Sequence, residues 1–187
     1  MSSFHKGLGL GDNSTEWNLL REDVTFPVAT LSAENLEHNL CWMQKFIEKY
    51  RVKLVPHGKT TMIPKLFHQQ IEHGAWGITL ATAQQVQVAY AAGIRRVLMA
   101  NQLIGKTNMT VIRQLLADDP DFDFYCLIDS TKNVEQLGEF FNSNTNQRKL
   151  QVLLEIGVKN GRTGIRNEDE EKSLLNALSK YTNSLEL

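Results

Sequence analysis

Short apolar runs alternate regularly with amphipathic stretches along this chain, which limits the folds that it can adopt. The apolar runs predict strands at residues 26–31, 52–55, 76–80, 96–100, 122–128 and 150–156. A stretch with helical periodicity follows each run, so that strands recur about every 20–28 residues. This alternation is typical of a parallel sheet whose strands are joined by helical crossovers.

Two parallel architectures fit this order of elements. One is an open, doubly wound sheet, and the other is a (β/α)8 barrel. Periodicity does not separate them, because both repeat the same strand and helix unit. The predicted strands are too few to close an eight-stranded barrel, which normally needs about 250 residues.

Several helix ends carry recognisable capping signals. Pro64 fits the first turn of a helix that ends at Gly74. Thr82 with Gln85 forms a capping box for the next helix, which is expected to end near Gly93. The last helix is expected to begin near Asn167, where four acidic residues suit the positive end of a helix.

Composition excludes several classes of protein. The 187 residues carry a formal net charge of -1, which gives no basic field for binding nucleic acid. No apolar run approaches the roughly 18 residues that a membrane helix needs. Residues 1–13 contain no apolar stretch of signal-peptide length, so we expect a cytoplasmic protein in which Cys41 and Cys126 are buried, reduced thiols. Residues 1–20 are polar and are expected to form an arm before a domain over 21–187.

Spacing argues against two other kinds of site. Gly58-Lys59-Thr60 imitates the end of a phosphate-binding P-loop, but the glycine required five residues earlier is replaced by Lys53. His68 and His73 lie five residues apart, which does not stack two ligands on one helix face. We therefore expect no metal site in this chain.

The segment with the strongest chemical signal is Val55-Pro56-His57-Gly58-Lys59-Thr60-Thr61-Met62. It follows a predicted strand and so lies at the carboxyl edge of the sheet, where βα folds gather catalytic groups. Lysine amines form Schiff bases with carbonyl compounds, and the neighbouring glycine lets the backbone approach a ligand. The residues alone leave two alternatives for Lys59, a functional amine or a solvent-exposed loop lysine.

Three segments resemble a known family. They are Pro56-His57-Gly58-Lys59-Thr60-Thr61-Met62, Gly74-Ala75-Trp76-Gly77-Ile78-Thr79-Leu80-Ala81-Thr82 and Leu98-Met99-Ala100-Asn101-Gln102-Leu103-Ile104-Gly105. In this order and spacing they resemble the D-threonine aldolase and D-serine dehydratase family, over about residues 17–167. These are fold-type III pyridoxal-phosphate (PLP) enzymes with an alanine-racemase-like N-terminal barrel. Within the family, these three segments are most similar in sequence to bacterial D-amino acid deaminases.

The resemblance implies roles for particular residues. Lys59 matches the lysine that bonds covalently to PLP and acts as acid and base at the substrate α-carbon. Arg162 matches an arginine near the phenolic oxygen of the cofactor, where a cation stabilises negative charge. Thr82 and Asn101 follow successive strands, so they either line the pocket or serve the backbone, as a helix cap and a hydrogen-bonding partner respectively. His57 either orients the site or folds the turn.

The activity implied is deamination of D-serine-like D-amino acids to keto acid and ammonia. Thr61 stands where aldolase and dehydratase relatives often carry histidine, which favours the deaminase branch. The alternatives are D-threonine aldolase cleavage of the Cα–Cβ bond, or a PLP-binding fragment without turnover. The expected partners are a D-amino acid and, for the full-length protein, a second copy of the chain.

The resemblance also predicts a partial barrel. The strand at residues 26–31 would belong to a C-terminal β-domain, which leaves five of eight barrel strands, with the phosphate-binding and metal-binding regions of relatives lying beyond Leu187. An unclosed barrel exposes a sheet edge and apolar faces. We therefore expect the 187-residue chain by itself to bind PLP weakly and to release no ammonia from D-serine.

Overall fold

The computed structural model describes residues 16–142 and 148–187, which form two compact units. The first unit ends at Trp42 and contains the short 3-10 helix η1 (Leu19–Arg21). Helix α1 (Ala33–Tyr50) begins in this unit and ends in the second. The polar arm predicted over residues 1–20 lies mainly in residues 1–15, outside the described residues.

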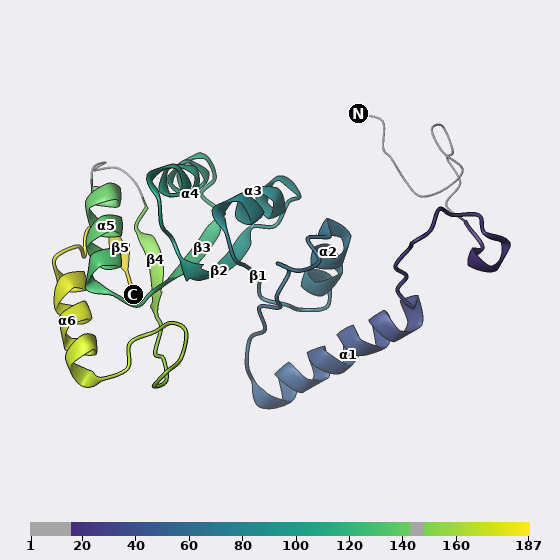
Figure 1. Cartoon of the computed structure of the whole chain (residues 1–187), viewed down its shortest axis with the longest axis horizontal. Coiled ribbons are helices and arrows are strands. Elements are labelled where there is room, and N and C mark those ends of the chain that lie inside the picture. Colours follow the sequence, from purple (N-terminus) through teal and green to yellow (C-terminus); the bar gives the residue numbers. More distant parts are fainter. Residues whose placement is uncertain (1–15, 143–147) are drawn as a thin grey trace. The chain divides into compact units, whose positions relative to one another are not determined.

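The second unit, Met43–Leu187, alternates helices and strands as the sequence predicts. Its elements are labelled in Figure 1 and follow the order α2 (Pro64–Glu72), β1 (Ile78–Leu80), α3 (Ala83–Ala91), β2 (Arg96–Gln102), α4 (Lys106–Asp118), β3 (Asp123–Ile128), α5 (Thr131–Asn142), β4 (Leu150–Leu154), α6 (Glu168–Ser179) and β5 (Leu185–Glu186). Every strand pairs with its neighbour in parallel.

The order of the strands separates the two architectures that periodicity left open. The sheet runs β1-β2-β3-β4-β5, so each strand lies beside the one that precedes it in the chain. A doubly wound sheet reverses its strand order at a switch point, whereas a barrel adds strands in one direction. The described part of the chain therefore has the fold of a partial parallel barrel, as predicted from the resemblance.

The core lies between the sheet and helices α2 to α6. Figure 1 shows α3 to α6 along one side of the strands. Burial alternates along β3, so that Phe124, Cys126 and Ile128 are fully buried towards the helices. Burial raises the pKa of the Cys126 thiol to about 12, so this cysteine is an inert core residue, as predicted. Cys41 is only half-buried, which differs from the predicted burial, and neither cysteine forms a disulfide.

The strand predicted at residues 26–31 is wrong. These residues are bent or extended and pair with no strand in the described parts of the chain. Phe26 is 61% exposed and Leu31 67% exposed, so the apolar run that suggested a strand is not buried. A strand is stabilised by its ladder of hydrogen bonds, and Pro27 has no N–H to contribute to one.

The strand predicted at residues 52–55 becomes an extended segment with an incomplete ladder. It runs parallel to β1 and is joined to it by an isolated bridge between His57 and Thr79. Thr79 N donates to Pro56 O at 2.8 Å, and Trp76 N donates to Leu54 O at 2.8 Å. Pro56 cannot donate the next hydrogen bond of the ladder, which explains why regular pairing is interrupted here.

The remaining strands and helices agree with the sequence within a few residues, with one addition. β5 was not predicted, because a strand of two residues shows no periodicity. Pro64 begins α2, Thr82 caps α3 and Asn167 caps α6, as the capping signals indicated. In the described residues, no helix combines the length and apolar character needed to cross a membrane.

Charged and aromatic side chains at the amino edge of the sheet satisfy one another. The Arg96 guanidinium lies 4.5 Å from the Trp76 ring centre and 2.9 Å from the Asp123 carboxylate. Arg148 donates to the carbonyls of Pro120 and Phe122 at 2.7 and 3.0 Å. At this edge of a barrel such residues contribute to stability, so the candidate site is sought at the opposite edge.

Candidate active site

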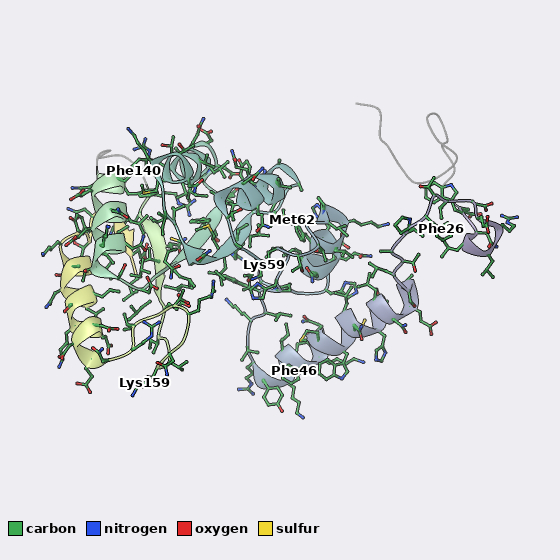
Figure 2. All side chains as sticks on the ribbon, in the orientation of Figure 1. Phe26, Phe46, Lys59, Met62, Phe140 and Lys159 are labelled. Carbon is green, nitrogen blue, oxygen red and sulfur yellow. The ribbon has the colours of Figure 1, made fainter. Side chains whose placement is uncertain are left out.

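Most residues singled out from the sequence lie at the carboxyl edge of the sheet. Lys59 lies in the loop between the extended segment and α2 (Figure 2). Thr82 follows β1, Asn101 is the last residue but one of β2, and Arg162 lies in the loop after β4. Carboxyl ends of neighbouring parallel strands meet at one edge, which explains why residues so distant in sequence share it.

The loop that carries Lys59 is tightly fixed by its backbone. Gly58 N donates to Thr79 O at 2.8 Å, and Met62 N donates to Gly58 O at 2.9 Å, which closes a turn around Lys59. Met62 has a φ of 46°, an uncommon conformation for a residue with a side chain. The turn therefore presents Lys59 from a defined backbone, and its side chain remains exposed.

Gly58 sets the distance between this turn and the core. A Cβ at position 58 would lie 2.5 Å from the ring of Phe67 and 2.9 Å from Ile78, and both side chains are fully buried. We expect Gly58→Ala to lower the free energy of unfolding by about 1–3 kcal/mol, as overpacked cores do. Thermal unfolding measures this, with the exposed Thr60→Ala as a control expected within about 0.5 kcal/mol of wild type. A Gly58→Ala protein as stable as the control would contradict the close packing.

Gln85 connects the Lys59 turn to helix α3. Its Nε2 donates to Lys59 O at 3.1 Å, and its Oε1 accepts from Ala81 N at 3.0 Å. Its backbone N donates to Thr82 Oγ1 at 3.2 Å. The sequence signal for Gln85 was its place in the capping box, and the structure shows a second contact that ties this box to the lysine turn.

Thr82 and Asn101 have the backbone roles that were weighed as alternatives. Thr82 Oγ1 caps α3, while Asn101 Nδ2 donates to Ala81 O at 3.4 Å and its Oδ1 accepts from Gln102 N at 3.2 Å. Both residues also line one cavity of about 250 Å³, together with Gln102 and Asn108. Their role in binding a cofactor stays a prediction, and the cavity brings them together as expected.

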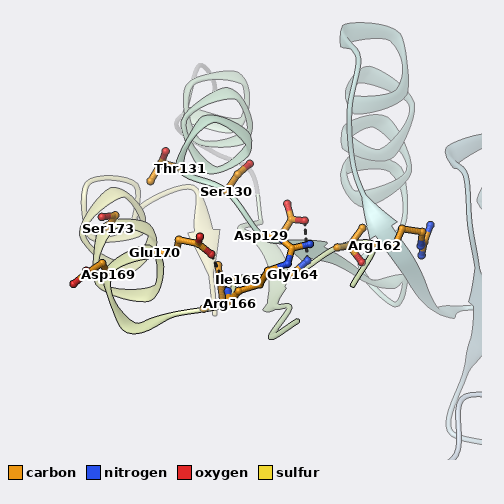
Figure 3. A pocket seen from close by; sticks show the side chains of 11 residues that line it. Asp129, Ser130, Thr131, Arg162, Gly164, Ile165, Arg166, Asp169, Glu170 and Ser173 are labelled. Carbon is orange, nitrogen blue, oxygen red and sulfur yellow. Dashed lines mark hydrogen bonds between the residues drawn. The ribbon is translucent and has the colours of Figure 1, made fainter. Parts of the chain in front are cut away.

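Arg162 lines a different, larger cavity of about 580 Å³. The other lining residues include Asp129, Thr163 and two acidic residues of α6, Asp169 and Glu170. Figure 3 shows Arg162 at the end of this cavity opposite to Asp169. Lys59 and His57 line neither cavity, and the side chain of His57 is exposed.

The loop that carries Arg162 is closed at its neck by two glycines. Gly157 N donates to Ile165 O at 2.7 Å, and Ile165 N donates to Glu155 O at 2.9 Å. A Cβ on Gly157 would lie 2.2 Å from Thr163 O, and a Cβ on Gly164 would lie 2.4 Å from Gly157 N. Only glycine allows the two backbones to approach so closely.

A second arginine holds the tip of the same loop. Arg166 Nη2 donates to Gly161 O at 2.7 Å and its Nε to Val158 O at 3.3 Å. Arg166 is therefore occupied by the loop itself. In contrast, the Arg162 guanidinium and the Lys59 amine have no hydrogen-bond or ion-pair partner in the described residues. These two unpaired cations at the carboxyl edge differ from Arg96 and Arg148 at the amino edge, whose guanidinium groups are paired.

Sequence reasoning missed a carboxylate that joins the ends of two strands. Glu155 follows β4 and accepts from Gln102 Nε2 at 2.9 Å and from Thr163 Oγ1 at 2.6 Å. The register between β2 and β3 shifts between Met99 and Gln102, and this irregularity sets where the Gln102 side chain lies. Glu155 had one available signal, an acidic residue near the end of the apolar run at residues 150–156, but nothing in the sequence indicates its partners.

Comparison with known proteins identifies the family of the chain. The alanine racemase N-terminal domain family matches residues 31–187, and the chain belongs to that family. The chain is 26% identical over 145 residues to a D-threonine aldolase from Arthrobacter sp. This match covers 78% of this chain and 37% of the relative. It is 24% identical over 143 residues to a D-threo-3-hydroxyaspartate dehydratase from Delftia sp. (strain HT23), which covers 76% of this chain and 36% of the relative.

A solved structure of a relative shows the same fold. The crystal structure of a D-threonine aldolase from Filomicrobium marinum superposes with a TM-score of 0.77 at 26% identity. The superposition covers 87% of this chain and 42% of the other. The chain thus spans well under half the length of the relatives that it matches.

Proposed function

We propose that this chain supplies the attachment lysine and adjoining residues of a PLP-dependent enzyme that deaminates D-serine-like D-amino acids. The observation that carries the proposal is the unpaired Lys59 amine on a fixed turn at the carboxyl edge of the sheet. Membership of the alanine racemase N-terminal domain family supports it, as do relatives named as an aldolase and a dehydratase.

The residues present fit a cofactor of this kind. PLP carries an aldehyde that an unpaired lysine amine can bind, together with anionic oxygens that a cation stabilises. Lys59 and Arg162 offer these two groups at the same edge of the sheet. When bound, PLP would act as a sink for the electrons left on the substrate α-carbon after its proton departs.

The residues of the chain would then perform distinct tasks. The Lys59 amine would take the proton from the α-carbon of the substrate. Arg162 would stabilise negative charge on the cofactor, and Thr82 and Asn101 would line the space beside it. Loss of the β-hydroxyl as water gives an enamine, whose hydrolysis yields a keto acid and ammonia. His57 is assigned to shaping the turn before Lys59, since its backbone bridges to Thr79.

The alternative function is aldol cleavage of the Cα–Cβ bond. It is favoured by the relative of 26% identity, which is named a D-threonine aldolase. Both reactions need a lysine and an electron sink, so the lysine turn does not distinguish them. Thr61, at a position where aldolase and dehydratase relatives often carry histidine, favours deamination.

Product analysis with two substrates separates these functions. We expect the holoenzyme that contains this chain to convert D-serine to equal amounts of pyruvate and ammonia, and D-threonine to 2-oxobutanoate and ammonia. An aldolase would instead release glycine and acetaldehyde from D-threonine. L-Serine is the control and should remain unchanged. Glycine as the main product, or no turnover of either D-amino acid, would contradict the proposal.

A further inference from the structure

We propose that Glu155 is a positioning residue that fixes the loop carrying Arg162, and this inference deepens the function proposed above. The loop runs from the end of β4 to the start of α6 and is exposed over most of its length. Val158 at 72% and Ile156 at 76% exposure contribute little packing energy. An arginine that must meet a cofactor from such a loop needs polar contacts to hold it in place.

Glu155 provides these contacts at the base of the loop. Its backbone N donates to Ile128 O at 2.9 Å, which continues the pairing of β3 with β4 beyond the last paired residue. Its backbone O accepts from Ile165 N at 2.9 Å, where the chain returns. One residue therefore joins the rigid sheet to both sides of the loop.

The carboxylate of Glu155 adds a connection across the sheet. Gln102, Leu127 and Leu153 lie in register on neighbouring strands, so Gln102 and Glu155 share the face that points away from the helices. The carboxylate bonds to Gln102 on β2 and to Thr163, the residue next to Arg162. Hydrogen bonds to a charged acceptor are stronger than neutral ones, and this acceptor is half-buried.

These contacts link the two cavities of the candidate site. Gln102 lines the smaller cavity with Thr82 and Asn101, and Thr163 lines the larger cavity with Arg162. Asp129 holds the same loop from the other side, because its Oδ2 accepts from Gly164 N at 3.1 Å. Glu155 thereby sets the position of Arg162 relative to Asn101, without bonding to either residue.

Two substitutions distinguish positioning from a direct charge effect. Glu155→Leu removes both side-chain hydrogen bonds. Glu155→Gln can keep both, because its amide oxygen accepts from Gln102 and its NH2 donates to the Thr163 hydroxyl. Glu139→Leu, on the exposed surface of α5, is the matched control.

The first measurement is hydrogen exchange in the protein without PLP. We expect the Gly157, Gly164 and Ile165 amides to exchange about tenfold faster or more in Glu155→Leu, since each lost hydrogen bond is worth about a factor of ten. Glu155→Gln and Glu139→Leu should exchange at the wild-type rate. Unchanged exchange in Glu155→Leu overturns the proposal, whatever the activity of the protein.

The second measurement is turnover of the holoenzyme in single and double variants. Glu155→Leu should lower kcat more than it raises KM, Glu155→Gln should restore kcat, and Glu155→Leu should have no further effect in an Arg162→Ala background. Additive losses, or an equal loss in Glu155→Gln, would show that Glu155 does not act through Arg162. If the loop loosens as expected while no D-amino acid is turned over, the proposed function fails and the structural role of Glu155 stands.

Discussion

Replacing Lys59 by alanine is expected to abolish covalent capture of PLP by the holoenzyme. Borohydride reduces the bond between a lysine and pyridoxal to a stable amine, so peptide mapping of the reduced wild-type protein should place the label on Lys59. The physical reason is that the Lys59 amine is unpaired among the described residues and is presented from a turn fixed by the Gly58 and Met62 backbone bonds.

Lys53 is a matched control for this experiment. It lies six residues earlier, and its amine lies 5.4 Å from the Trp76 ring centre, in the layer at the amino edge. Lys53→Ala should leave the label on Lys59 and its amount unchanged. A label on Lys53, Lys65 or Lys106 in the wild-type protein would contradict the assignment of Lys59.

Local signals predicted most of the fold. Buried strands of five to seven residues, such as β2 and β4, show as apolar runs, and helices α2, α3 and α6 begin where a proline, a threonine and an asparagine indicate. These signals depend only on residues close in sequence. The strand at residues 26–31 was wrong because a strand requires a partner, and an apolar run does not reveal whether one is present.

Strand order could not be predicted from periodicity. The sequential order of β1 to β5 depends on pairings between residues such as Leu98 and Tyr125, which are 27 positions apart. The resemblance to a family predicted the strand order, because members of a family share one topology. Local signals can also predict a strand that does not form a regular ladder. At residues 52–55 the apolar run is present, but Pro56, which directly follows it, interrupts the pairing.

The candidate site was predictable where chemistry and position coincide. Lys59, Thr82 and Asn101 come within four residues of the ends of apolar runs, so their shared edge follows from the parallel order of the strands. Glu155 and Gln102 were missed because their contact spans 53 positions and depends on a register shift in β2. Arg162 and Arg166 look equivalent in sequence, but Arg166 is bonded to Gly161 and Val158 in its own loop.

This difference between the two arginines predicts different consequences of their loss. Arg166 closes the loop, so its removal should reduce local order. The Arg162 guanidinium bonds to nothing in the described residues, and it lies in a loop held by Glu155 and Asp129. An unpaired cation that lines a cavity and sits in a fixed loop, as Arg162 does, is suited to a ligand rather than to stability. Its substitution should therefore affect function and leave unfolding almost unchanged.

We expect Arg162→Ala in the holoenzyme to lower kcat by about a hundredfold, equivalent to roughly 3 kcal/mol, with a much smaller change in KM. The effect falls on kcat because a cation beside the cofactor oxygen responds to charge that shifts during the reaction, not to charge already present when substrate binds. Lys159→Ala, an exposed cation in the same loop (Figure 2), is the control and should match wild type. Steady-state kinetics with D-serine at several concentrations measure both constants. An Arg162→Ala enzyme with wild-type kcat would mean that Arg162 lies away from the cofactor, and the unpaired cation would then need another ligand.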